Sequence, residues 1–223
     1  MCASDKRAMI TLYIVRHGQT VDNLEDRIQG HTDSPLTELG VRQAQAIAQR
    51  LSAERFHALY SSDLGRAVHT AEIVASPHGL AITTTPLLRE LHLGVAQGMT
   101  REQFREEYPE ACRLWESSPA IHRPPGGETV ESAIARCGEF IRQVVAQHGD
   151  GEKLAVIAHG GSLKGLIIAA FNLPVGFFAS MAASNASLSI LEIGERPRLR
   201  LFNDTCHLCG LEKTTSDADD GNG

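Results

Sequence analysis

The chain has 223 residues, 42% of them hydrophobic, and its formal net charge at pH 7 is −6. This length and hydrophobic content predict one domain with a sizeable core, and the acidic balance argues against a nucleic-acid partner. No stretch is long and apolar enough to span a membrane, and residues 1–9 lack the apolar region of a signal peptide, so we expect a cytoplasmic protein with no membrane partner.

The first half of the chain alternates between predicted strands and helices. An apolar, β-branched run at 10–15 is typical of a buried strand, and a polar loop leads from it to Pro35. Thr37 is the expected N-cap of a helix that reaches Leu51. The next predicted elements are a strand at 58–60, a helix at 64–74 and a short strand at 82–84.

The second half continues this alternation after an irregular segment. Residues 99–127 are charged and contain prolines and glycines, which predicts a helical excursion over the active site, followed by a turn. Apolar residues spaced by four and three from Val130 to Val144 predict a long amphipathic helix. The remaining predicted elements are a strand at 154–158, a helix at 162–171 and strands at 187–193 and 199–202.

This order of elements predicts an α/β fold. Alternating strands and helices favour a largely parallel sheet covered on both faces, so we expect a three-layer α/β/α sandwich with a mostly parallel central sheet. We treat residues 1–211 as a single domain with a helical lid at about 99–127. Residues 212–223 are polar, acidic and glycine-containing, which predicts a disordered tail.

Three of the predicted strands end in residues suited to binding phosphate. The first strand is followed by Arg16 and His17, and the second by a turn that ends in Arg66. The strand at 154–158 runs into His159 and a pair of glycines. Ligands bind at the carboxyl ends of strands in open α/β sheets, and guanidinium groups bind phosphate in a bidentate manner. We therefore predict one phosphate site, in which neutral His17 attacks phosphorus to form a phosphohistidine and His159 donates a hydrogen bond to a phosphoryl oxygen.

The leaving alkoxide of such a reaction needs a proton, and Glu90 is the best candidate to supply it. Glu90 follows a predicted strand in a leucine-rich context, although a solvated surface glutamate stays open on local sequence alone. The sequence lacks a P-loop and a GxGxxG motif, and residues 160–165 do not form a G-x-S-x-G nucleophile elbow. His17, His92 and His159 lack the local spacing typical of metal ligands, so no metal and no cofactor is expected.

The cysteines do not form a disulfide framework, because their number is odd and their spacing irregular. Two of them make a CxxC pair, but a structural zinc site usually takes four ligands and the sequence has no second pair. We favour an ordinary structural role for this pair over metal binding or redox chemistry. The five cysteines are Cys2, Cys112, Cys137, Cys206 and Cys209.

Five segments in a fixed order form a specific combination. They are VRHGQT at 15–20 with Asn23, SSDLGRA at 61–67, LREL at 88–91, PGGE at 125–128 and AHGG at 158–161. From about residue 12 to residue 193 the chain thereby resembles the histidine phosphatase superfamily, and within it the phosphoglycerate mutase-like branch.

The resemblance implies a role for each matched residue. His17 would be the phosphorylated nucleophile, and Glu90 the proton donor. Two arginines and a second histidine would form the phosphate pocket, while Asn23 and the Gly160 amide would contact the phosphoryl group and Gln29 would lie at the substrate mouth. The candidate site therefore comprises the catalytic residues Arg16, His17, Arg66, Glu90 and His159 and the substrate-binding residues Asn23, Gln29, Gly30 and Gly160.

The superfamily contains both phosphatases and mutases, and this chain departs from the mutase pattern in two places. An arginine usually follows the catalytic glutamate in mutases, whereas this chain has Leu91. Mutases also carry a longer basic insertion with paired arginines, and the segment at 99–123 is shorter and has no such pair. The segment GVAQG at 94–98, however, is closer to the mutase pattern than to that of phosphatases.

We therefore predict a metal-independent phosphatase that hydrolyses phosphate monoesters of small metabolites. A cofactor-dependent phosphoglycerate mutase and a catalytically silent phosphate-binding module are the alternatives, although a silent module would not need the proton donor Glu90. We expect a small phosphorylated metabolite as the partner, and a homodimer is the candidate assembly. Basic residues that could bind a second anionic group, or form a solvated helical face, are Arg101, Arg105, Arg113, His122 and Arg123.

Overall fold

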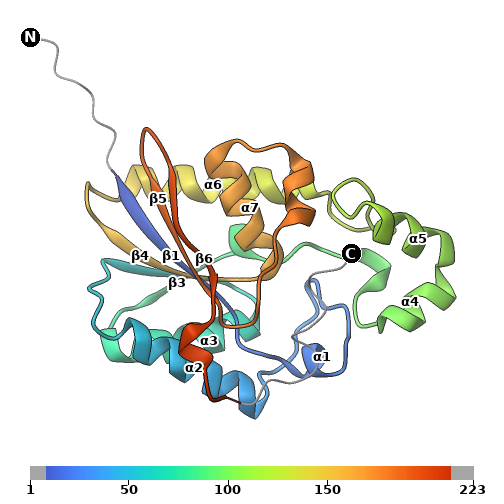
Figure 1. Cartoon of the computed structure of the whole chain (residues 1–223), viewed down its shortest axis with the longest axis horizontal. Coiled ribbons are helices and arrows are strands. Elements are labelled where there is room, and N and C mark those ends of the chain that lie inside the picture. Colours follow the sequence, from blue (N-terminus) through green and yellow to red (C-terminus); the bar gives the residue numbers. More distant parts are fainter. Residues whose placement is uncertain (1–8, 212–223) are drawn as a thin grey trace, which may run out of the picture.

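The computed structural model describes residues 9–211, so the tail expected at 212–223 and residues 1–8 lie outside the described residues. Its centre is a six-stranded mixed sheet with the strand order β3-β2-β4-β1-β5-β6 (Figure 1). Each predicted strand is present within a few residues of its expected bounds. The strands are β1 (Ile10–Arg16), β2 (Ala58–Ser62), β3 (Ile82–Thr85), β4 (Lys153–Ala158), β5 (Leu188–Ile193) and β6 (Arg198–Asp204).

The sheet is mostly parallel, as predicted, with an antiparallel edge. β1, β2, β3 and β4 run in the same direction, whereas β5 is antiparallel to both of its neighbours, β1 and β6. Only residues 194–197 connect β5 to β6, and a parallel pair would need a much longer crossover. The register places Arg16 at the end of β1 opposite Ala158 at the end of β4. His17 and His159, which follow these strands, therefore start from adjacent positions.

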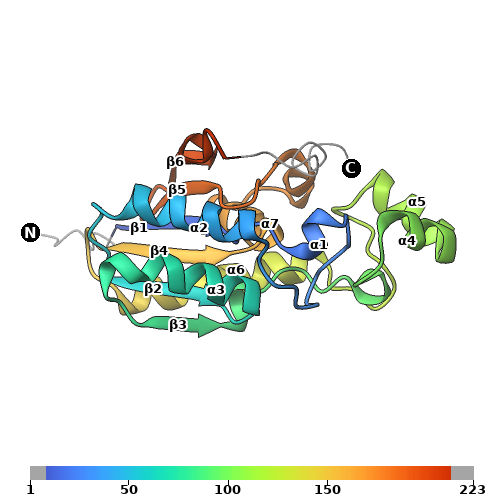
Figure 2. The same cartoon turned by 90° about the horizontal axis from the view of Figure 1, so that it is seen from below.

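Helices cover both faces of the sheet, which gives the predicted three layers (Figure 2). Side chains alternate along β1, so Leu12 and Ile14 pack into the core on one face while Tyr13 and Val15 pack into the core on the other. Burial on both faces explains why this strand is a continuous apolar run. The helices on the Leu12 face are α6 (Val130–Gln147) and α7 (Gly160–Phe171), and those on the Tyr13 face are α2 (Glu38–Leu51) and α3 (Gly65–Ala75).

Side-chain hydrogen bonds set where two of these helices begin. Thr37 caps α2 as predicted, because its hydroxyl accepts a hydrogen bond from the Gly40 amide at 2.9 Å. α7 begins at Gly160 rather than at the predicted Ser162, since His159 takes the N-cap position and the Ser162 hydroxyl accepts from the His159 amide at 3.0 Å. Among residues 9–211, no helix has both the length and the apolar character needed to cross a lipid bilayer.

The segment predicted to be a polar loop after the first strand contains a short helix, α1 (Val21–Leu24). Thr20 and Asn23 form a capping box at its start. The Thr20 hydroxyl accepts from the Asn23 amide at 3.2 Å, and Asn23 Oδ1 accepts from the Thr20 amide at 3.1 Å. A helix this short has no apolar periodicity, which is why the hydrophobic pattern did not reveal it.

The predicted helical excursion consists of α4 (Arg101–Glu107) and α5 (Pro109–Ser117), which lie beyond the sheet at the right of Figure 1. Tyr108 separates them because a proline disfavours the helical conformation in the residue before it. The two helices share a small core in which Phe104 is buried. The rings of Phe104 and Trp115 meet edge to face, with their centroids 5.9 Å apart.

The CxxC pair lies just after β6, near the end of the described chain. Cys206 and Cys209 are exposed and carry free thiols. The Asp204 carboxylate, which is hydrogen-bonded to Cys206, raises the pKa of the Cys206 thiol. Redox-active cysteines usually have a lowered thiol pKa, so an ordinary structural role for the pair stays our prediction.

Candidate active site

The carboxyl ends of the parallel strands open into a cavity of about 620 Å³. Its outer wall includes Trp115 of α5, so the helical excursion does reach the site. The predicted site residues that line the cavity are Arg16, His17, Asn23, Gln29, Gly30, Arg66, Glu90 and Gly160. The remaining one, His159, is fully buried against His17, with ring centroids 5.1 Å apart.

The hydrogen bonds of His17 determine which of its ring nitrogens carries the proton. Nδ1 lies 2.8 Å from the Gly18 carbonyl oxygen, and because a carbonyl only accepts, Nδ1 must be the protonated nitrogen. Nε2 lies 3.3 Å from Arg66 Nε, which only donates, so Nε2 keeps its lone pair. Nε2 is therefore the nitrogen that could attack a phosphoryl group.

The positive charge of the site comes from its arginines rather than from its histidines. Burial lowers the pKa of His17 well below its ordinary value, and the guanidinium groups of Arg66 and Arg16 lower it further. Burial and then the charge of Arg66 lower the pKa of His159 in the same way. Both imidazoles are therefore neutral at neutral pH, as a nucleophilic histidine must be. Within residues 9–211, no group of three or more His, Cys, Asp or Glu side chains is arranged to hold a metal ion.

Ser62 orients the His159 ring from the end of β2. His159 Nε2 lies 2.8 Å from Ser62 Oγ, and that hydroxyl already accepts a hydrogen bond from the Leu64 amide at 3.3 Å. This arrangement favours donation from Ser62 to Nε2, which places the histidine's own proton on Nδ1. Nδ1 is buried and has no hydrogen-bond partner among the described residues. It is thus the ring atom that could donate to a phosphoryl oxygen, a consequence that the motif alone did not reveal.

Main-chain oxygens fix the plane of the Arg66 guanidinium, which is only 1% exposed. Nη1 donates to the Thr32 carbonyl at 2.8 Å and Nη2 to the Gly30 carbonyl at 2.7 Å. We predicted that Gly30 contacts the substrate. In the structure Gly30 lines the cavity, and its carbonyl accepts a hydrogen bond from Arg66. Its φ of 55° lies in the left-handed region, and a Cβ there would overlap the Gln97 side chain, so glycine is required.

The side chain of Asn23 has one group left for a ligand. Its Oδ1 accepts from the Thr20 amide and hydroxyl and from Asn185 Nδ2 at 3.1 Å. The side-chain nitrogen of Asn23, Nδ2, thus remains as a donor for a phosphoryl oxygen. Asn185 also donates to the His17 carbonyl at 3.2 Å and lines the cavity. Sequence reasoning missed Asn185, because it lies outside the five motif segments and no local pattern marks it.

Gly160, Gln29 and Arg16 complete the lining. Gly160 lies between Arg16 and Glu90, since a Cβ built on it would be 3.8 Å from side-chain atoms of both. Arg16 Nη1 donates to the Ala183 carbonyl. Gln29 Oε1 is buried and has no hydrogen-bond partner among the described residues, so it is a candidate acceptor for a substrate hydroxyl.

Main-chain amides hold the Glu90 carboxylate over the start of α7. Oε1 accepts from the Leu91 amide at 2.8 Å, and Oε2 accepts from the Gly161 amide at 3.1 Å. A Cβ at position 161 would overlap Glu90 Oε1 and Leu91 Cδ1. The second glycine of the pair after His159 is therefore explained by the close approach of the glutamate.

We expect Gly161→Ala to lower turnover about 10- to 100-fold, because the added methyl group displaces the Glu90 carboxylate from its place. The matched control is Gly138→Ala on α6, whose new Cβ would meet its neighbours at an ordinary 3.6 Å. Steady-state kinetics and a thermal melt of both variants would make the comparison. A Gly161→Ala enzyme with unchanged turnover would show that the carboxylate position is not critical.

The family model described as the histidine phosphatase superfamily (branch 1) matches residues 12–205. A structure of mycobacterial glucosyl-3-phosphoglycerate phosphatase with VO3 is 35% identical, covers 87% of this chain and 99% of that chain, and superposes with a TM-score of 0.81. YhfR of Bacillus stearothermophilus is 34% identical, with coverage of 89% and 99% and a TM-score of 0.83.

The chain is also similar to a curated relative over part of its length. The probable phosphoglycerate mutase GpmB of Yersinia pestis (strain Pestoides F) is 41% identical over 122 residues. That match covers 55% of this chain and 57% of the relative, so it spans little more than half the length of either protein.

Proposed function

The chain belongs to the histidine phosphatase superfamily (branch 1), and from that premise we propose that it hydrolyses phosphate monoesters of small metabolites through a phosphohistidine intermediate. The observation that carries the proposal is the state of His17. This side chain is neutral, its Nδ1 proton is bound to the Gly18 carbonyl, and its Nε2 lone pair lies next to Arg66.

In the first step the substrate phosphate would bind to the guanidinium groups of Arg16 and Arg66 and to the side-chain amide of Asn23. These donors neutralise the charge of the phosphoryl oxygens. His17 Nε2 would attack phosphorus, and the bond between phosphorus and the ester oxygen would break. Glu90 would give its proton to that oxygen, so that an alcohol leaves.

In the second step water would attack the phosphohistidine. The Glu90 carboxylate, now without its proton, would accept one from the water, and the bond between phosphorus and Nε2 would break. The products are inorganic phosphate and neutral His17, with Glu90 protonated again. His159 Nδ1–H would stabilise the phosphoryl group in both steps.

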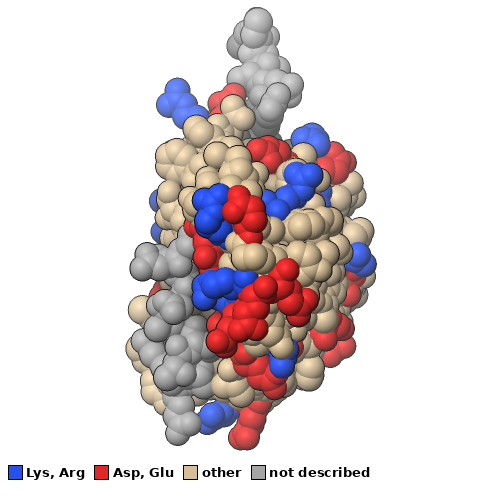
Figure 3. All heavy atoms as spheres, turned by 90° about the vertical axis from the view of Figure 1, so that its right-hand side faces the viewer, with Lys and Arg blue, Asp and Glu red and all other residues tan. Residues whose placement is uncertain are grey.

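Two observations support hydrolysis over isomerisation of phosphoglycerate. Leu91, where mutases have an arginine, is buried and packs against Val130 and Ala133. The arginines of the outer cavity wall already face carboxylates, because Arg27 Nε lies 2.8 Å from Glu25 and Arg101 Nε lies 3.9 Å from its acidic neighbour, Asp26. The surface at this end of the molecule likewise carries acidic and basic side chains next to each other (Figure 3).

A phosphoglycerate mutase is the second candidate, and the similarity to the Yersinia relative favours it. With 3-phosphoglycerate and catalytic bisphosphoglycerate, we expect negligible formation of 2-phosphoglycerate, together with clear phosphate release from p-nitrophenyl phosphate. The measurement is product analysis by NMR beside a phosphate assay. Isomerisation much faster than phosphate release would make the mutase correct, and no turnover at all would favour a silent binding module.

We expect phosphatase activity to survive EDTA, since Arg16 and Arg66 supply the positive charge that a metal ion would otherwise provide. The assay is p-nitrophenyl phosphate hydrolysis after incubation with the chelator and removal of the complexed ions. Loss of activity that returns on adding a divalent cation would contradict the metal-independent mechanism.

A further inference from the structure

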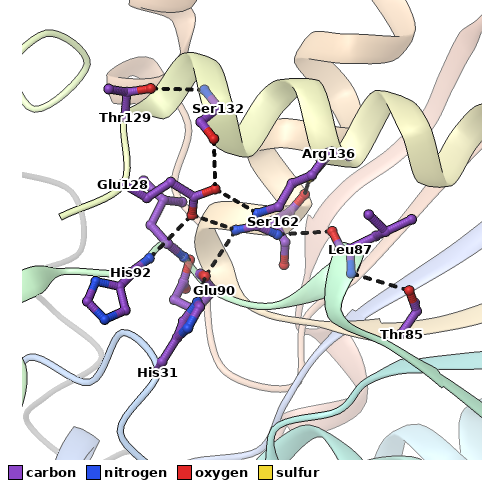
Figure 4. A network of polar contacts seen from close by, with 12 residues as sticks. His31, Thr85, Leu87, Glu90, His92, Glu128, Thr129, Ser132, Arg136 and Ser162 are labelled. Atoms are coloured by element: carbon purple, nitrogen blue, oxygen red, sulfur yellow. Dashed lines mark hydrogen bonds and ion pairs between the residues drawn. The ribbon is translucent and has the colours of Figure 1, made fainter.

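Two side chains from distant parts of the sequence hold the main-chain carbonyl of Glu90. His31 Nε2 lies 2.7 Å from this oxygen, and Arg136 Nη2 lies 3.0 Å from it (Figure 4). A carbonyl oxygen only accepts, so both side chains donate. Two donors on one carbonyl restrict the rotation of the peptide unit that carries the Glu90 side chain.

Arg136 of α6 is itself fixed by an ion pair with Glu128. Arg136 Nε lies 2.9 Å from Glu128 Oε1 and Nη2 lies 3.1 Å from Oε2, and the two side chains are 16% and 15% exposed. Arg136 Nη1 also donates to the Leu87 carbonyl at 2.9 Å. One guanidinium thus holds both ends of the turn from Leu87 to Glu90 (Figure 4).

The His31 contact connects this turn to the phosphate pocket. The carbonyls of Gly30 and Thr32, on either side of His31, are the two that orient Arg66. The segment 30–32 therefore positions both groups. Its main-chain carbonyls orient Arg66, and the His31 side chain holds the main chain of Glu90. A shift of this segment would move both groups together.

We propose that His31, Glu128 and Arg136, here called the Glu90 clamp, are positioning residues that keep the Glu90 carboxylate at the leaving-group oxygen. The inference rests on the proposed role of Glu90 as proton donor. It also gives a function to Glu128, the last residue of the PGGE segment at 125–128, which the mechanism does not otherwise use.

The test compares two substrates that differ in their need for a proton. The leaving group of glycerol 3-phosphate needs the acid, whereas p-nitrophenolate leaves as a stable anion. For Arg136→Gln we expect kcat/KM on glycerol 3-phosphate, which reports the step that forms the phosphohistidine, to fall about 10- to 100-fold, with a smaller loss of kcat/KM on p-nitrophenyl phosphate. The matched control is Arg142→Gln, which removes an exposed ion pair with Glu139 from the same helix and should change neither rate.

A pair of His31 variants keeps the test informative if Arg136→Gln does not fold. His31→Gln retains an N–H donor at the end of the side chain, and His31→Met has a similar length without one. We expect His31→Gln to keep most of its activity and His31→Met to show the same substrate-dependent loss as Arg136→Gln. The clamp residues act through Glu90, so a clamp substitution should cost little more in a Glu90→Gln background.

Two outcomes would overturn the proposal in different ways. Equal losses on both substrates, or losses that add to that of Glu90→Gln, would mean that the clamp serves the fold and not the proton transfer. If Glu90→Gln itself showed no dependence on the leaving group, both the clamp and the donor role of Glu90 would fall. In that case phosphate release by the native enzyme would still support the phosphatase.

Discussion

His17→Ala should abolish turnover and remove the covalent intermediate. The alanine side chain has no lone pair with which to attack phosphorus, and no neighbouring side chain places a nitrogen where His17 Nε2 lies. His159 cannot substitute, because its Nε2 is hydrogen-bonded to Ser62 and its fully buried ring is 5.1 Å from that of His17 between centroids. Loss of a nucleophile that acts as a unit with its neighbours removes nearly all of the catalysis that the unit supplies.

The measurement is a brief incubation with a labelled phosphate monoester, followed by acid or base treatment of the denatured protein. A phosphohistidine is labile in acid and stable in base, so native enzyme should lose its label only in acid. The matched control is His69→Ala, which replaces an exposed histidine on α3 and should label normally. A label that persists in His17→Ala would assign the nucleophile to another residue.

The core of this site could be predicted because its residues lie where strands end. The apolar run of β1 ends at Arg16, and the register of β1 against β4 brings the next residues, His17 and His159, together. Ligand binding at the carboxyl ends of parallel strands needs only the order of strands and helices. The antiparallel pairing of β5 with β1 was not predictable in this way, because residues 172–187, between α7 and β5, carry no regular hydrophobic pattern.

The residues that the sequence did not reveal act through contacts across long distances in the chain. Asn185 contacts Asn23, 162 residues earlier, and Arg136 contacts the carbonyl of Glu90, 46 residues earlier. Neither contact leaves a periodic pattern or a capping signal in the local sequence. The sequence does not reveal the role of His31 either, because its partner is a main-chain oxygen and any residue at position 90 would supply one.

Glu90→Gln should lower kcat about 10²- to 10⁴-fold, the usual cost of removing a positioned acid and base. The substitution keeps the size of the side chain and one acceptor for the amides of Leu91 and Gly161, but the amide group cannot donate a proton to an alkoxide. Phosphate binding depends on the arginines and should persist, so the Kd for inorganic phosphate should change little.

The size of this loss should depend on the leaving group. On glycerol 3-phosphate the first step needs the proton, so it should slow most and phosphoenzyme should not accumulate. On p-nitrophenyl phosphate the first step should proceed, giving a burst of p-nitrophenolate, while hydrolysis of the phosphohistidine stays slow without a base for water. Stopped-flow kinetics would measure the burst, with Glu131→Gln as the control at an exposed position of α6. An equal loss on the two substrates, without a burst, would exclude Glu90 as the proton donor. A burst on p-nitrophenyl phosphate alone would place Glu90 in both steps of the reaction. Its loss as an acid would slow the first step only on glycerol 3-phosphate, and its loss as a base would slow hydrolysis of the phosphohistidine formed from either substrate.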